Sequence, residues 1–158
     1  MPYLRHVASE DLLLLFEWAN DPAVRRNAFN PKPISYARHC SWFSMKLHDR
    51  NAYMYVYMEG TDPVGQIRFD CSDGVLEVDV SIAASQRGRG YGVGIIRDGT
   101  LLALNEARAS YAVAYVLPSN TASLNAFLAV GYNDTGTVTY MGKRVHKLQY
   151  PAGVVNAR

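Results

Sequence analysis

The chain has 158 residues, of which 49% are hydrophobic and 19% charged, and its formal net charge is +2 at pH 7. This length predicts a single domain over residues 1–158 with a buried core. The small net charge gives no reason to expect a nucleic-acid partner, and no apolar run reaches the ~20 residues of a membrane-spanning helix. With no signal-peptide layout at residues 1–6 and only two cysteines, we expect a cytoplasmic protein without a membrane partner.

The N-terminal third is predicted to form a strand followed by two helices. Residues 3–7 are expected to be the first strand. Ser9 is a suitable cap for a helix with acidic residues in its first turn, and this helix should end before Pro22. A second helix is expected after the cap Ser35, and the Pro- and Asn-rich residues 27–33 are interpreted as the loop between the two helices.

The rest of the chain alternates strands and helices. Strands are expected at residues 52–58, 64–71, 75–82, 111–117, 132–141 and 143–150, with helices at residues 91–107 and from 120 to about 130. The order β-α-α-β-β-β-α-β-α-β-β predicts an α/β fold with one central sheet and helices on both faces. The portion from residue 75 to 117 requires a parallel strand pair with a right-handed crossover.

A glycine-rich segment, Arg87-Gly88-Arg89-Gly90-Tyr91-Gly92, separates a predicted strand from the long predicted helix. A turn of this kind exposes backbone N–H groups at the start of a helix, where the helix dipole adds partial positive charge. Glycine has no Cβ, so an anion can approach the main chain closely. The two arginines add further positive charge. The segment therefore predicts a pyrophosphate site.

Spacing distinguishes among the known phosphate loops. The dinucleotide pattern G-x-G-x-x-G fails because Val93 and Ile95 stand where a third glycine is needed, and the Lys-Ser/Thr pair of a P-loop is missing. The spacing that fits is R-x-x-G-x-G, formed by Arg87, Gly90 and Gly92. It resembles the acetyl-CoA pyrophosphate loop of the GNAT acyltransferase superfamily. The resemblance implies acetyl-CoA as cosubstrate and a mostly antiparallel mixed sheet with one parallel, splayed strand pair.

A second motif is similar to the same family. Asn120-x-x-Ser123-x-x-x-Phe127-x-x-x-Gly131-Tyr132 resembles the GNAT signature N-x-x-S/A-x-x-x-Y/F-x-x-x-G-F/Y. The resemblance implies that the asparagine, the serine and the phenylalanine contact the CoA arm, and that the Gly–aromatic pair turns the chain into the next strand. An asparagine before a helix and a glycine after one are also ordinary caps.

The N-terminal third narrows the resemblance to a subgroup. Residues 18–25 read W-x-N-D-P-x-V-R, which resembles a stretch shared by ribosomal-protein and nucleotide-amino-sugar N-acetyltransferases. Residues 34–43 and 65–69 are closer to the amino-sugar enzymes, which acetylate a 4-amino sugar carried on UDP during pseudaminic acid synthesis. The resemblance therefore implies a small-molecule acceptor amine on a sugar nucleotide. Arg38 stands where this subgroup leads us to expect an acidic residue.

Two carboxylates on the strand before the glycine segment are the candidate catalytic groups. Glu77, Asp79 and Ser81 share one face of that strand, opposite a face of apolar residues. Both faces of a central sheet are normally covered, so carboxylates there indicate a site. Glu77 is our first candidate for the base that deprotonates the amine, directly or through water, and Asp79 is the second. Alternatively, both carboxylates pair with Arg68 or Arg87.

The resemblance also implies a role for the backbone of this strand. Main-chain groups of Val80, Ser81 and Ile82 would bind the pantetheine arm, and one N–H would polarise the thioester oxygen. Many GNAT enzymes have a tyrosine at the position of Phe127 that protonates the leaving thiolate. Phenylalanine has no proton to donate, so we assign no general acid.

The acceptor residues follow from the subgroup motifs and from charge. His39, Trp42 and Arg68 are candidate contacts to the sugar nucleotide, and Arg25 is a candidate partner of its phosphate; the alternatives are a surface histidine, a core tryptophan and a solvated arginine. The histidines show no metal-ligand spacing, so no metal is expected. The expected function is acetyl-CoA-dependent N-acetylation of a nucleotide-linked amino sugar. The alternatives are acetylation of a protein N-terminus and non-catalytic acyl-CoA binding.

Overall fold

The computed structural model describes residues 1–151, and in them seven strands form one sheet in the order β1-β2-β3-β4-β5-β7-β6. Only β4 and β5 run parallel; the other neighbours are antiparallel. The strands are β1 (Pro2–His6), β2 (Ala52–Glu59), β3 (Asp62–Ser72), β4 (Val75–Ile82), β5 (Tyr111–Val116), β6 (Asn133–Tyr140) and β7 (Lys143–Tyr150). The helices are α1 (Leu12–Ala19), α2 (Pro22–Arg26), α3 (Tyr36–Leu47), α4 (Tyr91–Ala107) and α5 (Thr121–Val130).

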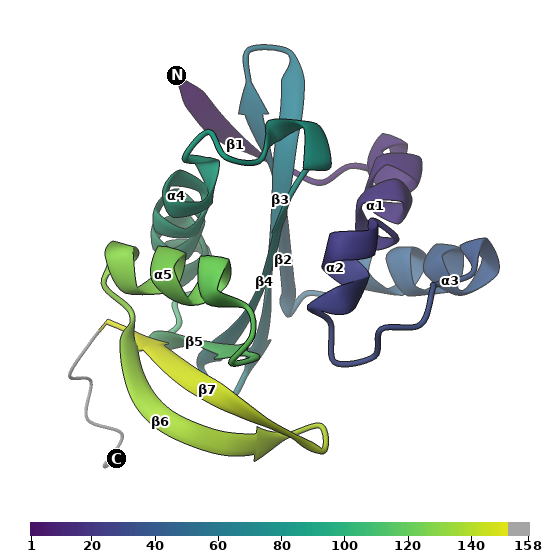
Figure 1. Cartoon of the computed structure of the whole chain (residues 1–158). Coiled ribbons are helices and arrows are strands. Elements are labelled where there is room, and N and C mark those ends of the chain that lie inside the picture. Colours follow the sequence, from purple (N-terminus) through teal and green to yellow (C-terminus); the bar gives the residue numbers. More distant parts are fainter. Residues whose placement is uncertain (152–158) are drawn as a thin grey trace.

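Helices cover both faces of the sheet, which confirms the predicted architecture (Figure 1). α4 and α5 lie against one face, whereas α1, α2 and α3 lie on the opposite side. The curved β6–β7 hairpin extends the sheet beyond β5. Alternate side chains of each central strand therefore point toward α4 or toward the α1–α3 layer. No helix within residues 1–151 combines the length and apolar character needed to cross a bilayer.

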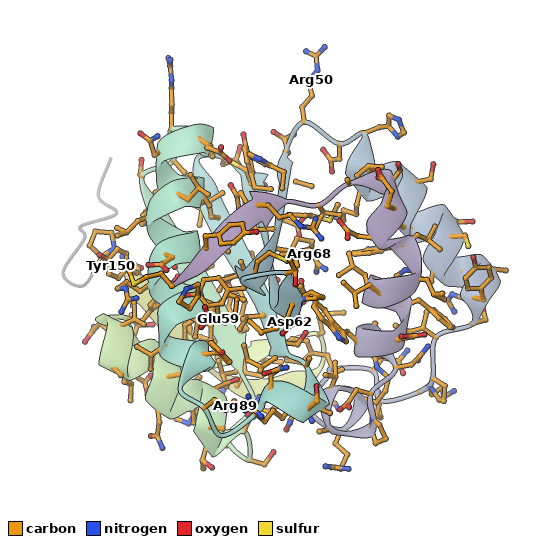
Figure 2. All side chains as sticks on the ribbon, turned by 90° about the horizontal axis from the view of Figure 1, so that it is seen from above. Arg50, Glu59, Asp62, Arg68, Arg89 and Tyr150 are labelled. Atoms are coloured by element: carbon orange, nitrogen blue, oxygen red, sulfur yellow. The ribbon has the colours of Figure 1, made fainter. Side chains whose placement is uncertain are left out.

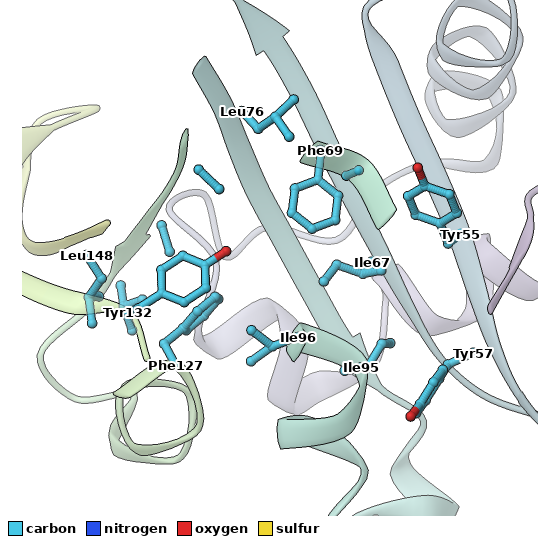
Figure 3. Packing of buried hydrophobic residues seen from close by; sticks show 14 of the residues in the cluster. Tyr55, Tyr57, Ile67, Phe69, Leu76, Ile95, Ile96, Phe127, Tyr132 and Leu148 are labelled. Atoms are coloured by element: carbon cyan, nitrogen blue, oxygen red, sulfur yellow. The ribbon is translucent and has the colours of Figure 1, made fainter. Parts of the chain in front are cut away.

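The hydrophobic core lies between the sheet and the α4–α5 layer (Figure 3). Ile67 and Phe69 of β3 and Ile95 of α4 are completely buried there, and burial of such a side chain stabilises the fold by about 1.5–3 kcal/mol. Gly99 allows α4 to approach the sheet, because a Cβ at this position would lie 3.0 Å from two side-chain atoms of Ile67. This packing fixes α4 relative to β3 and β4, and so fixes the glycine segment that joins β4 to α4.

The predictions for the middle of the chain are confirmed closely. β4 and α4 have the predicted bounds. Ser35 caps α3, because its Oγ accepts a hydrogen bond from the N–H of Arg38 at 3.2 Å. Asn120 caps α5 in the same way, accepting the N–H of Ser123 at 3.3 Å. The helix starts that border the candidate site are therefore set by local sequence.

The predicted cap of the first helix is wrong. A 3-10 helix begins at Ser9, and it is the side chain of Asp11 that accepts the N–H of Ala8 at 2.8 Å, not a Ser9 cap that starts the helix. α1 ends at Ala19, before Asp21-Pro22 as predicted, but the short helix α2, which was not predicted, begins at Pro22. Asp21 caps α2 by accepting two N–H groups of its first turn, and proline suits a first turn because its missing N–H has no helical partner.

Candidate active site

A cavity of about 1020 Å³ lies between the α1–α3 layer and the sheet. It continues along β4 and β5 to the glycine segment and the start of α5, and the β6–β7 hairpin borders it through Tyr140 and Met141. All candidate site residues named from the sequence border this cavity except Arg89, which borders a neighbouring cavity of about 340 Å³. The structure thus brings the separate sequence motifs to one place.

The cavity enters the sheet where β4 and β5 separate. Their parallel pairing consists of Val75 with Tyr111, Leu76 with Ala112, and Glu77 with Val113. On its other edge β4 stays paired with β3 as far as Ile82. The β5-facing edge of residues 78–82 therefore has backbone N–H and C=O groups with no strand beside them among the described residues. The predicted splayed pair is confirmed, and its open edge can pair with an extended polar ligand.

The glycine segment forms an exposed turn at the N-terminus of α4. Gly88 and Gly90 have φ angles of 78° and 83°, which is left-handed backbone that favours glycine. A Cβ at either position would meet no atom within 4 Å, so the main chain faces open space. The first N–H groups of a helix have no intrahelical partner and carry the positive end of its dipole. These features fit a pyrophosphate group.

The two arginines of the segment differ in their surroundings. Arg87 donates from Nε to the carbonyl of Ile82 at 3.1 Å and from Nη2 to Asp21 Oδ1 at 3.0 Å. Burial alone would raise the pKa of Asp21, but the hydrogen bonds from Arg87 and from the α2 backbone lower it below its ordinary value. Arg89 is exposed and lies at the periphery of the molecule (Figure 2). Arg87 thus joins the segment to the acceptor-side helices, whereas Arg89 is free to meet a ligand.

The second motif borders the cavity from α5. Asn120, Ser123 and Phe127 all contribute to its wall. Phe127 is only 3% exposed, and its ring meets that of Tyr132 edge-on with centroids 4.9 Å apart. Phe127 therefore serves in packing at this position and has no hydroxyl that could donate a proton.

Polar side chains form a stripe on the cavity side of β3 and β4. The antiparallel register places three pairs on this face: Gln66 with Ser81, Arg68 with Asp79, and Asp70 with Glu77. Gln66 Nε2 donates to Ser81 Oγ at 3.1 Å and to Asp79 Oδ2 at 3.2 Å. The carboxylates that the sequence singled out therefore lie in a hydrogen-bonded stripe, beside the cavity and away from the core.

Arg68 organises this stripe from near the centre of the molecule (Figure 2). Its Nε donates to Asp70 Oδ2 at 3.0 Å, its Nη1 lies 3.7 Å from Asp79 Oδ2, and its guanidinium lies 5.1 Å from the ring centroid of Trp42. Burial alone would lower the pKa of Arg68, but Asp79 and Asp70 outweigh burial and raise it. For Asp79, the alternative of a pair with Arg68 is thus present in the structure.

Glu77 lies at the point where β4 and β5 separate, and its partner is a tyrosine. The hydroxyl of Tyr140 donates to Glu77 Oε2 at 2.5 Å. The ring of Tyr140 stacks on Tyr115 of β5 with centroids 4.1 Å apart and planes 3° from parallel, and Phe29 meets it edge-on at 5.2 Å. Sequence reasoning missed these three aromatic residues. The alternating tyrosines of the predicted strand at residues 111–117 were the available signal for Tyr115 alone.

His39 and Arg25 have structural contacts of their own at the cavity wall. His39 is 3% exposed, with Nε2 2.9 Å from the carbonyl oxygen of Leu12, so it is not a surface histidine. Burial lowers its pKa, although that hydrogen bond opposes the change. The Arg25 guanidinium donates to three carbonyl oxygens, those of Ala19, Asn30 and Lys32. Its side chain thereby holds the loop between α2 and α3 against the cavity.

Among residues 1–151, no three His, Cys, Asp or Glu side chains are grouped closely enough to hold a metal ion. Glu77 and Asp79 can accept a proton, and the free backbone of β4 and the first turn of α4 can bind polar and anionic ligand groups.

Comparison with known proteins identifies the family. A sequence model described as Acetyltransferase (GNAT) domain matches residues 3–133. The chain belongs to the GNAT acetyltransferase family. This confirms the predicted superfamily and the predicted class of enzyme. A search of curated proteins finds no match.

Solved structures share the GNAT fold over nearly the whole chain. The aminoglycoside acetyltransferase AAC(6')-Ib with ribostamycin and coenzyme A has a TM-score of 0.83 at 21% identity, covering 94% of this chain and 92% of that one. Spermidine N-acetyltransferase from Vibrio cholerae with CoA and spermine has a TM-score of 0.84 at 14% identity, covering 94% of both chains. A domain from Methanocaldococcus jannaschii has a TM-score of 0.79 at 19% identity, covering 94% of this chain and 97% of that one. At these identities the likeness establishes the GNAT fold.

Proposed function

We propose that this enzyme transfers the acetyl group of acetyl-CoA to the primary amine of an amino sugar, and that the sugar is carried on UDP. The observation that carries the first part is the free edge of β4, which leads directly to the exposed N–H groups at the start of α4. One elongated ligand with amide groups at one end and a pyrophosphate at the other matches both features. The neighbouring structures solved with CoA support this choice of ligand.

The residues that hold acetyl-CoA follow from this arrangement. The turn at Gly88 and Gly90 and the α4 N-terminus receive the pyrophosphate, with Arg89 beside it. The open backbone edge at Val80 to Ile82 pairs with the pantetheine amides, and one of its N–H groups faces the thioester oxygen. Asn120 and Ser123 border the same path from α5. When bound, acetyl-CoA supplies a thioester carbonyl that an amine can attack.

Glu77 is the better placed of the two candidate bases. Asp79 Oδ2 accepts a hydrogen bond from Gln66 and lies 3.7 Å from Arg68 Nη1, so Asp79 is held in the polar stripe beside β3. Glu77 stands at the apex of the β4–β5 split, where the cavity enters the sheet, and its hydrogen bond from Tyr140 is made by Oε2. In the reaction, the amine nitrogen forms a bond to the acetyl carbon, Glu77 takes the amine proton directly or through water, and the carbon–sulfur bond breaks. The thiolate then takes a proton from solvent.

The acceptor end of the cavity supports a nucleotide-linked sugar. Its rim carries the cationic side chains of Lys32 and Arg38, both exposed and both bordering the cavity. Trp42 also borders it and is only partly buried, so its ring is accessible for stacking on a base. Cations at the rim attract phosphate, while the carboxylates deeper in the cavity attract the amine. Arg38, a departure from the subgroup motif, thus has a role as a phosphate partner.

A second acceptor class is favoured by the carboxylates themselves. Glu77 and Asp79 give the inner cavity two acidic groups, which suit a cationic acceptor without phosphate. The neighbouring structures of an aminoglycoside acetyltransferase with ribostamycin and of a spermidine acetyltransferase with spermine contain acceptors of this kind. Free amino sugars and polyamines are therefore the alternative acceptors.

An acceptor panel tests the proposal by measuring thiol release from acetyl-CoA. The panel contains a UDP-linked 4-amino sugar, ribostamycin, spermine and a peptide with a free N-terminus. We expect the highest kcat/KM with the UDP sugar, and we expect Arg38→Gln to raise KM for that acceptor but not for ribostamycin. Turnover of the peptide alone would reject an amino-sugar acceptor. Tight CoA binding without thiol release for any amine would reject catalysis.

A further inference from the structure

Tyr140 reaches the proposed base from a distant part of the chain. It is the last residue of β6, next to the hairpin tip, and 63 positions separate it from Glu77. Its hydroxyl donates to Glu77 Oε2 at 2.5 Å, a short hydrogen bond of the charge-assisted kind. The contact crosses from the outer hairpin of the sheet to the point where β4 and β5 separate. A single hydrogen bond therefore joins the hairpin to the reacting end of the cavity.

The tyrosine ring is held on two sides. Tyr115 of β5 stacks on it in parallel with centroids 4.1 Å apart, and Phe29, from the loop between α2 and α3, meets it edge-on at 5.2 Å. Aromatic contacts of this kind contribute about 0.5–1.5 kcal/mol each beyond burial. The rings come from three separate segments and leave the side chain of Tyr140 little rotational freedom. Its hydroxyl is thus aimed at Glu77 before any substrate arrives.

In this contact the hydroxyl of Tyr140 is the hydrogen-bond donor and the carboxylate of Glu77 is the acceptor. Burial, together with the hydrogen bond to Glu77, raises the pKa of Tyr140. The hydroxyl therefore keeps its proton at neutral pH and donates it in a hydrogen bond to the carboxylate. A phenol held in this way is a poor acid for a thiolate, so Tyr140 does not replace the hydroxyl that Phe127 lacks. What it can do is fix the orientation of the Glu77 carboxylate.

We infer that Tyr140 is a positioning residue: its hydroxyl occupies one oxygen of Glu77 and turns the second oxygen toward the amine. This inference rests on the proposed role of Glu77 as the base. A neighbouring side chain that hydrogen-bonds a catalytic group in this way holds that group in the orientation needed to reach its substrate. Tyr115 and Phe29 support the arrangement through the ring alone.

Other charged groups face the same carboxylate and remain in place when the tyrosine hydroxyl is removed. Glu77 lies opposite Asp70 in the β3–β4 register and on the same face as Asp79. The titratable and charged groups around it are Arg68 and Asp70 on β3, Asp79 on β4, Tyr115 on β5, Tyr140 on β6, and Lys46 of α3, which pairs with Asp70. A change in kcat on removal of one hydroxyl is therefore attributable to the Tyr140 hydrogen bond.

The test is Tyr140→Phe, which keeps the stacked ring and removes only the hydroxyl. We expect kcat to fall about 10- to 100-fold, the effect of losing one hydrogen bond to a charged group, with KM for the acceptor and Kd for CoA unchanged. A fall in kcat without a change in KM or Kd distinguishes lost positioning of the base from structural damage, which would also weaken binding. Tyr3→Phe is the matched control, since the Tyr3 hydroxyl donates to the carbonyl of Gly60 far from the cavity.

A double variant separates this inference from the proposed function. If Tyr140 acts through Glu77, Tyr140→Phe should have no further effect on kcat in a Glu77→Gln background. A wild-type kcat in Tyr140→Phe, combined with an inactive Glu77→Gln, would overturn the positioning role and leave the base in place. A fully active Glu77→Gln would overturn both. A wild-type protein that binds CoA and releases no thiol would overturn the proposed function itself.

Discussion

The glycine segment offers the sharpest test of the donor site, through Gly90→Val. Gly90 has a φ of 83°, and a Cβ there meets no atom within 4 Å, so the variant is strained without being crowded. Left-handed backbone costs a side-chain-bearing residue about 1–2 kcal/mol. For a domain of this size, each kcal/mol lowers Tm by about 2–4 °C, so we expect a loss of about 2–8 °C.

The same substitution should also weaken CoA binding. A valine side chain stands over the N–H groups at the start of α4 and blocks close approach of a phosphate. Loss of one such hydrogen bond to a charged group costs about 1.5–3 kcal/mol, which corresponds to a Kd about 10- to 100-fold higher. Isothermal titration calorimetry with CoA measures this change directly, and differential scanning fluorimetry measures Tm.

Gly60→Val is the matched control for this experiment. Gly60 lies in the β2–β3 turn with a φ of 61°, and a Cβ there also meets no atom within 4 Å. It should lose a similar amount of Tm and keep the CoA affinity of the wild type. Wild-type CoA affinity in a folded Gly90→Val protein would refute the pyrophosphate assignment. Equal losses of affinity would show that the effect comes from global destabilisation.

Three further predictions concern the base, the core and acid stability. Glu77→Gln should lower kcat/KM about 10²- to 10⁴-fold near neutral pH, as measured by thiol release, and an unchanged value would remove Glu77 as the base. Tyr132 and Thr100 share a buried hydrogen bond of 2.8 Å, so Tyr132→Phe should cost about 1–3 kcal/mol in urea unfolding, and adding Thr100→Val should recover part of that loss. Full additivity of the two losses would contradict this. The hydrogen bond from Arg5 lowers the pKa of Asp11 below 3.8, so this pair stabilises the fold fully above that pH and loses its contribution as the pH falls. The unfolding free-energy difference between wild type and Asp11→Asn should therefore shrink toward pH ~3, and a constant difference would argue against the pair.

Local signals in the sequence were sufficient to predict the elements that border the proposed donor site. The strand β4, the glycine segment and α4 follow one another without long-range choices, because period-2 alternation, left-handed glycines and helical periodicity each act over a few residues. Asn120 likewise caps α5 through a contact three positions away. These features were predictable because each depends on neighbours in the chain.

The acceptor side depends on contacts that no local pattern encodes. Tyr140 meets Glu77 only because the bent β6–β7 hairpin returns across β5, and Phe29 meets Tyr140 only because the α2–α3 loop folds over the cavity. The missed helix α2 has a different cause. The sequence Asp21-Pro22 is compatible with the end of one helix and with the start of another. A new helix starts here because the side chain of Asp21 accepts two N–H groups of its first turn.

The short parallel contact between β4 and β5 has a consequence for the lifetime of the folded chain. Three residue pairs join a four-stranded half of the sheet to a three-stranded half. A ligand lying in the gap serves as a temporary extra strand that bridges the two halves. At a concentration 100 times its Kd, such a ligand adds about 2.7 kcal/mol to the stability of the native state. The supply of acyl donor in the cell therefore also determines how often this protein unfolds.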